Sequence, residues 1–201
     1  MPEFRCAAVV LAAGASTRLG QPKQLIRIGS QSLLRRTVRL AIEAGCSPVY
    51  VVLGFESDQM TPELTGLAVE TVINPAWQQG MGSSLRAGMQ ALLRAPTQPD
   101  AVLLLVCDQP RLTAEHLREL LTWHWAARTK SEIAITASTY AQRNGVPAVF
   151  STKLLPELLA ITGDHGARDL IRAHARQVQG IPWAAGEFDI DRPEDLNTIE
   201  A

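Results

Sequence analysis

"CAAVVLAAGASTRLGQPKQL", residues 6–25, passes directly from an apolar run into a short loop bounded by Gly14 and Gly20. An uninterrupted apolar run of this length is typical of a strand that is buried on both faces of a sheet. The loop fits neither common phosphate-binding pattern. It has five residues between its glycines and then Gln21, which does not match a Walker loop, and it lacks the Gly-x-Gly-x-x-Gly run of a dinucleotide fold. The stretch therefore predicts a buried strand followed by another kind of anion-binding loop.

Outward from this stretch, apolar runs alternate with amphipathic ones along the chain. Further strands are predicted at 49–54, 68–73, 101–107, 132–138, 146–150 and 187–191, and helices at 32–45, 83–95, 113–128, 151–161, 167–176 and 193–200. This alternation predicts a mainly parallel, Rossmann-like sheet covered by helices on both faces, which is a three-layer α/β/α sandwich. Such sheets bind ligands at the carboxyl ends of their strands. Candidate functional residues are therefore sought directly after each strand.

Composition indicates a single globular domain over residues 1–201. Hydrophobic residues make up 46% of the chain and charged residues 19%, and the formal net charge of −1 gives no basic field for nucleic acid. Three cysteines (Cys6, Cys46 and Cys107) are scattered through apolar segments, which predicts buried thiols rather than disulfides or a zinc site. No apolar run approaches the roughly 20 residues that span a membrane. We therefore expect a reduced, cytoplasmic protein that binds neither nucleic acid nor membrane.

The loop after the first strand carries two cations at positions suited to an anion. Its small residues allow backbone N–H groups to approach phosphate closely, Arg18 can place two donors on phosphate oxygens, and Lys23 can add a point charge. A plain strand-to-helix turn with two solvated cations is an equally good interpretation of the loop alone.

Carboxylates after other strands favour a divalent cation. Asp108 follows the most apolar strand, at 101–107, where it could bind a hard cation or cap the turn before Pro110. In the predicted strand 187–191, Asp189 and Asp191 alternate with apolar residues and so share one face. Asp191 could also cap the following helix, but capping leaves Asp189 unexplained. An anion loop and these carboxylates together predict a Mg²⁺ site formed by Asp108, Asp189 and Asp191.

Two polar segments complete the candidate site. "NPAWQQGMGSSLRAG" (74–88) forms a lip before a helix, in which Asn74, Gly80 and Ser84 are candidate nucleotide contacts. Trp77 is expected in the core, with a pocket wall as the alternative. "GDHGARDL" (163–170) is a compact turn before the next helix. There Asp164 or His165 could contact substrate and Arg168 could contact phosphate, although an ordinary helix-start loop would look the same.

Taken together, "LAAGASTRLGQPKQL" resembles the signature of nucleotidyltransferases that move a nucleoside monophosphate from an NTP to a phosphorylated acceptor. "NPAWQQGMGSSL", "CDQP", "NGVPAVF", "GDHGAR" and "DIDRPEDL" are similar, in order, to the molybdenum cofactor cytidylyltransferase branch. The resemblance implies that Ala12, Ala13 and Gly14 lie along the nucleotide, that Arg18 and Lys23 hold the triphosphate, and that Asp108 and Asp191 ligate Mg²⁺. It also places Gln109 and Pro110 beside the acceptor. Arg192 departs from the small threonine usual at that point in the branch.

The resemblance implies CMP transfer from CTP to molybdenum-loaded molybdopterin, with Arg18, Lys23 and Asp108 as catalytic residues, and a molybdoenzyme as a possible recipient of the product. A sugar phosphate or methylerythritol phosphate is an alternative acceptor. A non-catalytic chaperone that binds the molybdenum cofactor is an alternative of another class. Pyrimidine preference follows from the resemblance alone, because the residues do not determine the base.

Overall fold

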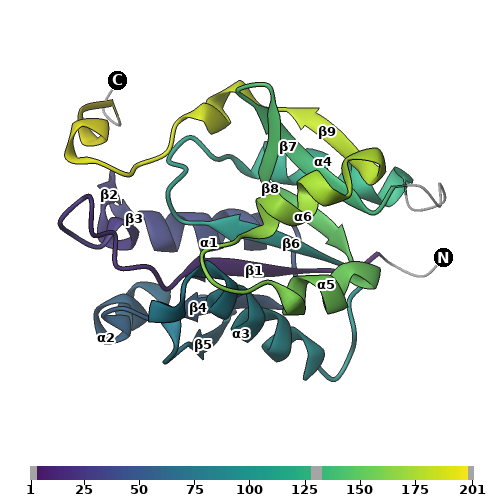
Figure 1. Cartoon of the computed structure of the whole chain (residues 1–201). Coiled ribbons are helices and arrows are strands. Elements are labelled where there is room, and N and C mark those ends of the chain that lie inside the picture. The colour runs from purple at the N-terminus through teal and green to yellow at the C-terminus, as the bar shows by residue number, and fades with distance from the viewer. Residues whose placement is uncertain (1–3, 128–132, 199–201) are drawn as a thin grey trace.

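A seven-stranded sheet with strand order β5-β4-β1-β6-β8-β7-β9 runs through the protein (Figure 1). The structure is a computed structural model that describes residues 4–127 and 133–198. Its strands are β1 (Cys6–Ala12), β4 (Val49–Leu53), β5 (Glu70–Ile73), β6 (Ala101–Val106), β7 (Ile135–Tyr140), β8 (Arg143–Ser151) and β9 (Val178–Pro182), with a separate hairpin of β2 (Arg27–Ile28) and β3 (Gln31–Ser32). Strands β5, β4, β1 and β6 are parallel, β8 is antiparallel to both its neighbours, and β9 is parallel to β7. The sheet is therefore mainly parallel, as predicted.

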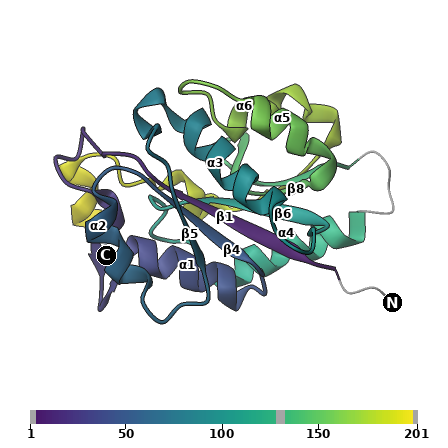
Figure 2. The ribbon, with the colours of Figure 1, turned by 90° about the horizontal axis from the view of Figure 1, so that it is seen from below.

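Helices cover both faces of this sheet (Figure 2). The α-helices are α1 (Leu33–Glu43), α2 (Ser57–Met60), α3 (Met81–Leu93), α4 (Ala114–Ala127), α5 (Leu155–Ala160) and α6 (Ala167–Ala173). The 3-10 helices are η1 (Lys23–Leu25), η2 (Thr61–Leu64), η3 (Trp77–Gln79), η4 (Thr152–Leu154), η5 (Ala175–Gln177), η6 (Ala184–Glu187) and η7 (Pro193–Thr198). The single-domain, three-layer α/β/α architecture is thereby confirmed.

Alternation along β1 separates the two cores. Ala8 and Val10 face the core formed with α1, α2 and α4, whereas Ala7 and Val9 face the core formed with α3, α5 and α6. All four side chains are fully buried. A strand that is covered on both faces needs apolar residues at every position, which is why this run contains no polar residue.

Two local predictions were wrong. Residues 187–191 do not form a strand, since the segment crosses the end of β6 with one backbone bond there, from Ile190 N to Asp108 O (2.9 Å). The helix predicted at 83–95 begins two residues earlier, at Met81, and ends at Leu93, so Ser83 and Ser84 lie inside its first turn.

Other differences concern one edge strand and the last helix. Strand β9 was not predicted, because its sequence "VQGIP" mixes glycine, proline and polar residues at the sheet edge. The predicted last helix is the 3-10 helix η7. Predictions for Arg128, Glu132 and residues 199–200 lie outside the described residues.

The three cysteines are buried and unpaired in the described chain, as expected. Within residues 4–127 and 133–198, none of the helices has the length and apolar character needed to cross a membrane.

Candidate active site

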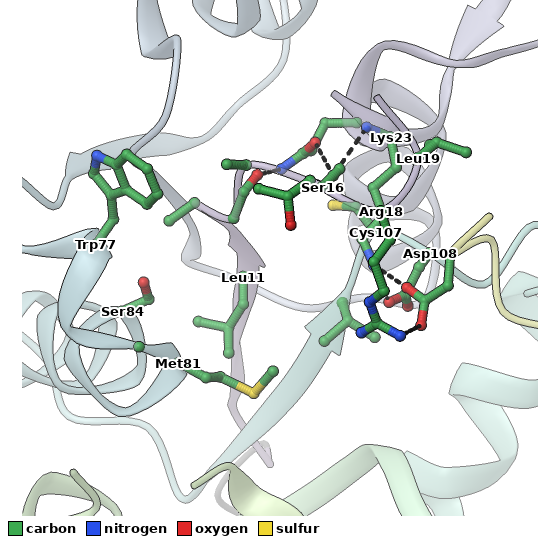
Figure 3. Close-up of a pocket in the computed structure, with 18 of the residues that line it drawn as sticks. Leu11, Ser16, Arg18, Leu19, Lys23, Trp77, Met81, Ser84, Cys107 and Asp108 are labelled. Carbon is green, nitrogen blue, oxygen red and sulfur yellow. Dashed lines mark hydrogen bonds and ion pairs between the residues drawn. The ribbon is translucent and has the colours of Figure 1, made fainter. Parts of the chain in front are cut away.

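A cavity of about 680 Å³ opens at the carboxyl ends of β1 and β6 (Figure 3). Its wall combines the loop after β1, the start of α3, the end of β6 and parts of the two later segments, 163–166 and 189–192. Figure 3 shows Trp77, Met81 and Ser84 on one side of this space, and Arg18 and Asp108 on the other. The cavity thus has a largely uncharged side and a charged side.

The loop after β1 is fastened by a buried glutamine. Gln24, which is 2% exposed, donates from Nε2 to the carbonyl oxygens of Ala12 (2.9 Å) and Gly14 (2.8 Å). Ser16 takes a positive φ of 50° and accepts from Lys23 N (3.2 Å). These bonds close the loop on itself, so Arg18 and Lys23 leave it at fixed positions. Sequence reasoning missed Gln24. Its signal was a polar residue adjacent to Lys23 in a segment whose backbone carbonyls need donors.

On the charged side, Lys23 joins two carboxylates that are far apart in the sequence. Its Nζ lies 2.6 Å from Asp108 Oδ2 and 3.1 Å from Asp191 Oδ1, and Arg18 lies 3.6 Å from the other oxygen of Asp191. The side chains of Lys23 and Asp108 are only 20% and 19% exposed. Burial alone would lower the pKa of Lys23, but the two carboxylates outweigh it and raise the pKa above its ordinary value. Lys23 is therefore a charged ammonium held between two carboxylates.

Three acceptor atoms near this group have no hydrogen-bond partner among the described residues: Asp108 Oδ1, Gln109 Oε1 and Asp189 Oδ1. Gln109 is 3% exposed, and its Nε2 donates to the Val146 carbonyl (3.0 Å). Burial, followed by the charges of Asp108 and Asp191, raises the pKa of Asp189 to about 6. Buried acceptors without donors are costly, and they cluster where a ligand or cation can satisfy them.

The uncharged side is built on Asn74, which follows β5. Its Nδ2 donates to the hydroxyl oxygens of Ser83 (2.9 Å) and Ser84 (3.0 Å), while its Oδ1 accepts from Ala76 N (3.0 Å). Asn74 is 4% exposed and does not itself line the cavity. It fixes the first turn of α3 and presents Ser84 to the cavity.

Two glycines allow the 163–166 turn to lie against α3. A Cβ on Gly80 would be 2.5 Å from Asp164 Oδ1, and a Cβ on Gly82 would be 2.8 Å from the Thr162 backbone. A backbone hydrogen bond from Gly82 N to Gly163 O (2.8 Å) joins the two segments. The two segments, some 80 residues apart, thereby form one wall, in which Asp164 lines the cavity.

The structure brings together most of the residues that the sequence singled out, although it does not test their roles. Those that line the cavity are Ala13, Gly14, Arg18, Lys23, Gly80, Ser84, Asp108, Asp164 and Asp191. Those that do not are Ala12, Asn74, Gln109, Pro110, His165, Arg168 and Asp189. Trp77, expected in the core with a pocket wall as the alternative, does both: it is partly buried against the core beside α3, and it lines the cavity, with an edge contact to Phe55 (5.4 Å between ring centroids). His165 points its Nδ1 at Asp169 (2.7 Å), so its partner among the described residues lies in the first turn of α6, which follows it in the chain.

The donor set fits a hard divalent cation. Carboxylate oxygens are the preferred ligands of Mg²⁺, and Asp108 has a buried oxygen without a partner. Oxygens of Asp108 and Asp191 already lie around a common cation, the Lys23 ammonium. The described residues contain no group of three or more His, Cys, Asp or Glu side chains placed to hold a metal. Such a cation would therefore take further oxygen ligands from a bound phosphate or water.

Comparisons with known proteins agree with this geometry. Residues 8–178 match the family described as a MobA-like NTP transferase domain. A nicotine blue oxidoreductase of Paenarthrobacter nicotinovorans is 31% identical over 198 residues, covering 96% of this chain and 92% of that protein. A protein of Nostoc sp. named as a probable molybdenum cofactor guanylyltransferase is 31% identical over 200 residues, covering 96% of this chain and 89% of its own.

Solved structures share the fold over the whole chain. Rv0371c from Mycobacterium tuberculosis H37Rv is similar with a TM-score of 0.81 and 26% identity, covering 98% of this chain and 99% of that one. A second structure of Rv0371c, with a TM-score of 0.76, is of its complex with manganese. The matched family model spans most of the chain, from before the first loop to the start of β9. The chain therefore belongs to the MobA-like NTP transferase family, and it is a nucleotidyltransferase.

Proposed function

We propose that this nucleotidyltransferase transfers CMP from CTP to the phosphate of molybdenum-loaded molybdopterin and releases pyrophosphate. The observation that carries the proposal is the meeting of Arg18 and Lys23 with Asp108 and Asp191 at one end of the cavity. Nucleotide transfer needs cations for the triphosphate and carboxylates for a metal, and both gather here. The CTP and pterin assignments rest on the similarity of the later motifs to the cytidylyltransferase branch.

In this mechanism the protein aligns the acceptor phosphate with the nucleotide and neutralises the negative charge of the triphosphate. Arg18, whose side chain is 71% exposed, reaches the triphosphate from the mouth of the cavity, and Lys23 reaches it from within. Both offset the negative charge that builds on the departing pyrophosphate. An acceptor phosphate oxygen attacks the α-phosphorus in line, so the P–O bond to that oxygen forms as the bond to pyrophosphate breaks. The acceptor phosphate is already ionised near neutral pH, and no general base is required.

Asp108 and Asp191, with Asp189 beside them, would hold a divalent cation, for which we propose Mg²⁺. When bound, such an ion supplies Lewis-acid stabilisation of the phosphate oxygens at the reacting centre. The carboxylates would hold the cation, and Arg18 and Lys23 offset their negative charge on this side of the cavity. Nucleotidyltransferases of this family generally use a divalent metal, and the manganese complex of Rv0371c is consistent with a metal here.

The nucleoside would lie between the loop after β1 and the start of α3. Ala13 and Gly14 line the cavity with small groups and backbone atoms, Ala12 is buried directly before them in the chain, and Gly80 and Ser84 line the cavity from the start of α3. Ser84 Oγ accepts from Asn74, which leaves its proton for the nucleotide. Asn74 thus acts through Ser84.

We place the acceptor beside the end of β6 and the 163–166 turn. Gln109 and Pro110 are buried and do not line the cavity, so they would support this side from behind its wall. Asp164 lines the cavity, while His165 and Arg168 are exposed and would contact the outer part of the acceptor. Arg192 follows Asp191 in the chain and would affect the acceptor pocket near that carboxylate.

A pyrophosphate-release assay tests the proposal. Purified protein, Mg²⁺ and each of the four NTPs are combined with molybdenum-loaded molybdopterin, a sugar phosphate or methylerythritol phosphate. We expect release with CTP and the loaded pterin only. Preference for GTP would assign the activity named for the Nostoc relative, and release with another acceptor would assign that substrate class.

Two further outcomes count against catalysis of this kind. Tight binding of CTP or the loaded pterin without any pyrophosphate release would favour the chaperone alternative, in which the cofactor is handed to a molybdoenzyme. Oxidation of added NADH or NADPH would instead indicate an oxidoreductase activity, which is the class of activity for which the Paenarthrobacter relative is named. The sequence lacks the usual dinucleotide fingerprint, so we expect no such oxidation.

A further inference from the structure

Lys23 occupies the position between the two carboxylates that a divalent cation would bridge. Its Nζ contacts Oδ2 of Asp108 at 2.6 Å and Oδ1 of Asp191 at 3.1 Å, and the first of these contacts is largely shielded from water, whereas the Asp191 side chain is 41% exposed. A metal ion bound to the same two oxygens would lie within about 2.0–2.1 Å of each. An ammonium and a divalent cation cannot share that space, because their charges repel and their ligand oxygens coincide.

We propose that Lys23 competes with the divalent cation for Asp108 and Asp191, so that cation and nucleotide bind cooperatively. This rests on the proposed function. When a polyphosphate binds, it offers Lys23 new anionic oxygens, and the lysine can leave the carboxylates to the cation. Lys23 is thus a positioning residue for the metal as well as a phosphate ligand.

Two observations favour this exchange over a fixed ion pair. Gln24 and Ser16 anchor the backbone of Lys23, whereas its flexible side chain alone spans the distance to the carboxylates. Asp108 also keeps a buried oxygen, Oδ1, that Lys23 does not satisfy. A lysine that leaves half of a buried carboxylate without a donor is a weaker partner than a cation with several coordination sites.

The test uses Mn²⁺ alone as the probe and measures the free Mn²⁺ signal by electron paramagnetic resonance. Without nucleotide, we expect Lys23→Met to bind Mn²⁺ at least about tenfold more tightly than the wild type, because one positive charge has been removed from within 4 Å of both carboxylates. Lys23→Arg, which keeps a cation there, should resemble the wild type. Circular dichroism establishes that each variant is folded, and Lys23→Gln serves if Lys23→Met is not.

Controls separate a local effect from a change in net charge. Lys153→Met removes an exposed lysine in η4 and should leave Mn²⁺ affinity unchanged. The double variant Lys23→Met/Asp108→Asn should lose the gain. Unchanged Mn²⁺ affinity in the folded Lys23 variants, an equal gain in Lys153→Met, or a gain that survives Asp108→Asn would each overturn the proposal.

A second arm measures how much CTP tightens Mn²⁺ binding. We expect strong tightening in the wild type and a smaller factor in Lys23→Met. If CTP does not bind at all, the proposed function fails at the nucleotide, yet the Mn²⁺-only comparison still decides whether Lys23 competes with the cation. The two failures are therefore distinguishable.

Discussion

Two groups of polar side chains inside this protein differ in how completely they satisfy one another. Beneath α4, a buried polar network comprises His116, His124, Thr136 and Ser138. His116 Nε2 lies 2.7 Å from Ser138 Oγ, which donates to the Pro147 carbonyl (2.8 Å), and His124 Nδ1 lies 3.1 Å from Thr136 Oγ1. By contrast, three buried acceptors in or next to the cavity wall have no partner among the described residues, and of their side chains only that of Asp108 lines the cavity.

This difference distinguishes polar groups that stabilise the fold from polar groups that are available to bind a ligand. Ser138 gives its proton to Pro147, so His116 must donate from Nε2, and its ring stacks on Trp183 with centroids 4.8 Å apart. The Ser138 hydroxyl thus has both a donor and an acceptor, and neither His116 nor Ser138 lines the cavity. At the cavity, incomplete pairing leaves binding capacity at the cost of stability, which is a common feature of functional sites. The network should therefore matter for folding, and the cavity group for activity.

The largest expected effect is on activity. Asp108→Asn removes charge from the proposed metal site while keeping size and shape, so we expect the pyrophosphate-release rate to fall by about 10²–10³-fold, as when a main electrostatic contact is lost. Asp58→Asn, in exposed α2, is the matched control and should be neutral. A fall of less than threefold in Asp108→Asn would mean that this carboxylate is not part of the reacting centre.

The network should make stability depend on pH. Burial lowers the pKa of both His116 and His124 to about 4, below their ordinary value of about 6.5. Between these values the unfolded chain binds protons that the folded chain does not. Stability is thus fully present above pH 6.5 and is lost as pH falls towards 4, by on the order of 3 kcal/mol for each histidine.

Urea unfolding at several pH values measures this slope. Asp189, whose pKa is raised to about 6, acts in the opposite direction and offsets part of the loss. Replacing His124 by Asn should make the slope shallower, because one of the two groups has been removed. A slope that is unchanged in this variant would show that the histidine does not remain neutral in the fold.

A smaller effect is expected from a single hydroxyl of the network. Ser138→Ala leaves the Pro147 carbonyl without its donor and His116 without its acceptor, so we expect the free energy of unfolding to fall by about 1–3 kcal/mol. Ser30→Ala, at an exposed position, should change it by less than about 0.5 kcal/mol. The rate of pyrophosphate release should be unaffected. A loss of activity in a stable Ser138→Ala protein would break the division between the two groups.

The sequence predicts the sheet well because burial on both faces leaves a clear pattern. The apolar runs at 6–13, 49–54 and 101–107 correspond to β1, β4 and β6, the centre of the parallel half of the sheet. The strand predicted at 187–191 failed because alternation of polar and apolar residues does not show whether a neighbouring strand is available. There, one backbone bond to Asp108 replaces a ladder.

The site was predicted in part for a related reason. Residues directly after strands share one edge of the sheet, so Lys23, Asp108 and Asp191 could be expected to lie near one another. Their contacts span 85 and 168 residues, and no spacing rule indicates which cation pairs with which carboxylate. The role of Gln24 in closing the loop was missed because its partners are backbone carbonyls, so that the only signal was a polar residue next to Lys23, and the sequence does not identify the carbonyls to which it donates.

The smallest predicted effect is an increase in the free energy of unfolding, whereas Ser138→Ala in the buried network is expected to lower it. Asp189 has a buried oxygen without a partner and lies close enough to Asp108 and Asp191 for their charges to raise its pKa. Asp189→Asn removes the charge, so at pH 7 we expect the free energy of unfolding to rise by about 1 kcal/mol. Because a protonated Asp189 carries no charge either, the gain should shrink as pH falls through about 6.

Urea unfolding of Asp189→Asn at pH 7 and at pH 5 checks both the sign and its pH dependence, with Asp58→Asn as the control for removing an exposed charge. A destabilised Asp189→Asn protein would mean that this carboxylate has a structural partner and belongs with the satisfied groups. If Asp189→Asn is stabilised while Ser138→Ala is destabilised, the Asp189 charge lowers the stability of the fold, whereas the Ser138 hydroxyl raises it. A stability cost of that kind is expected only where the charge serves a bound cation or phosphate ester.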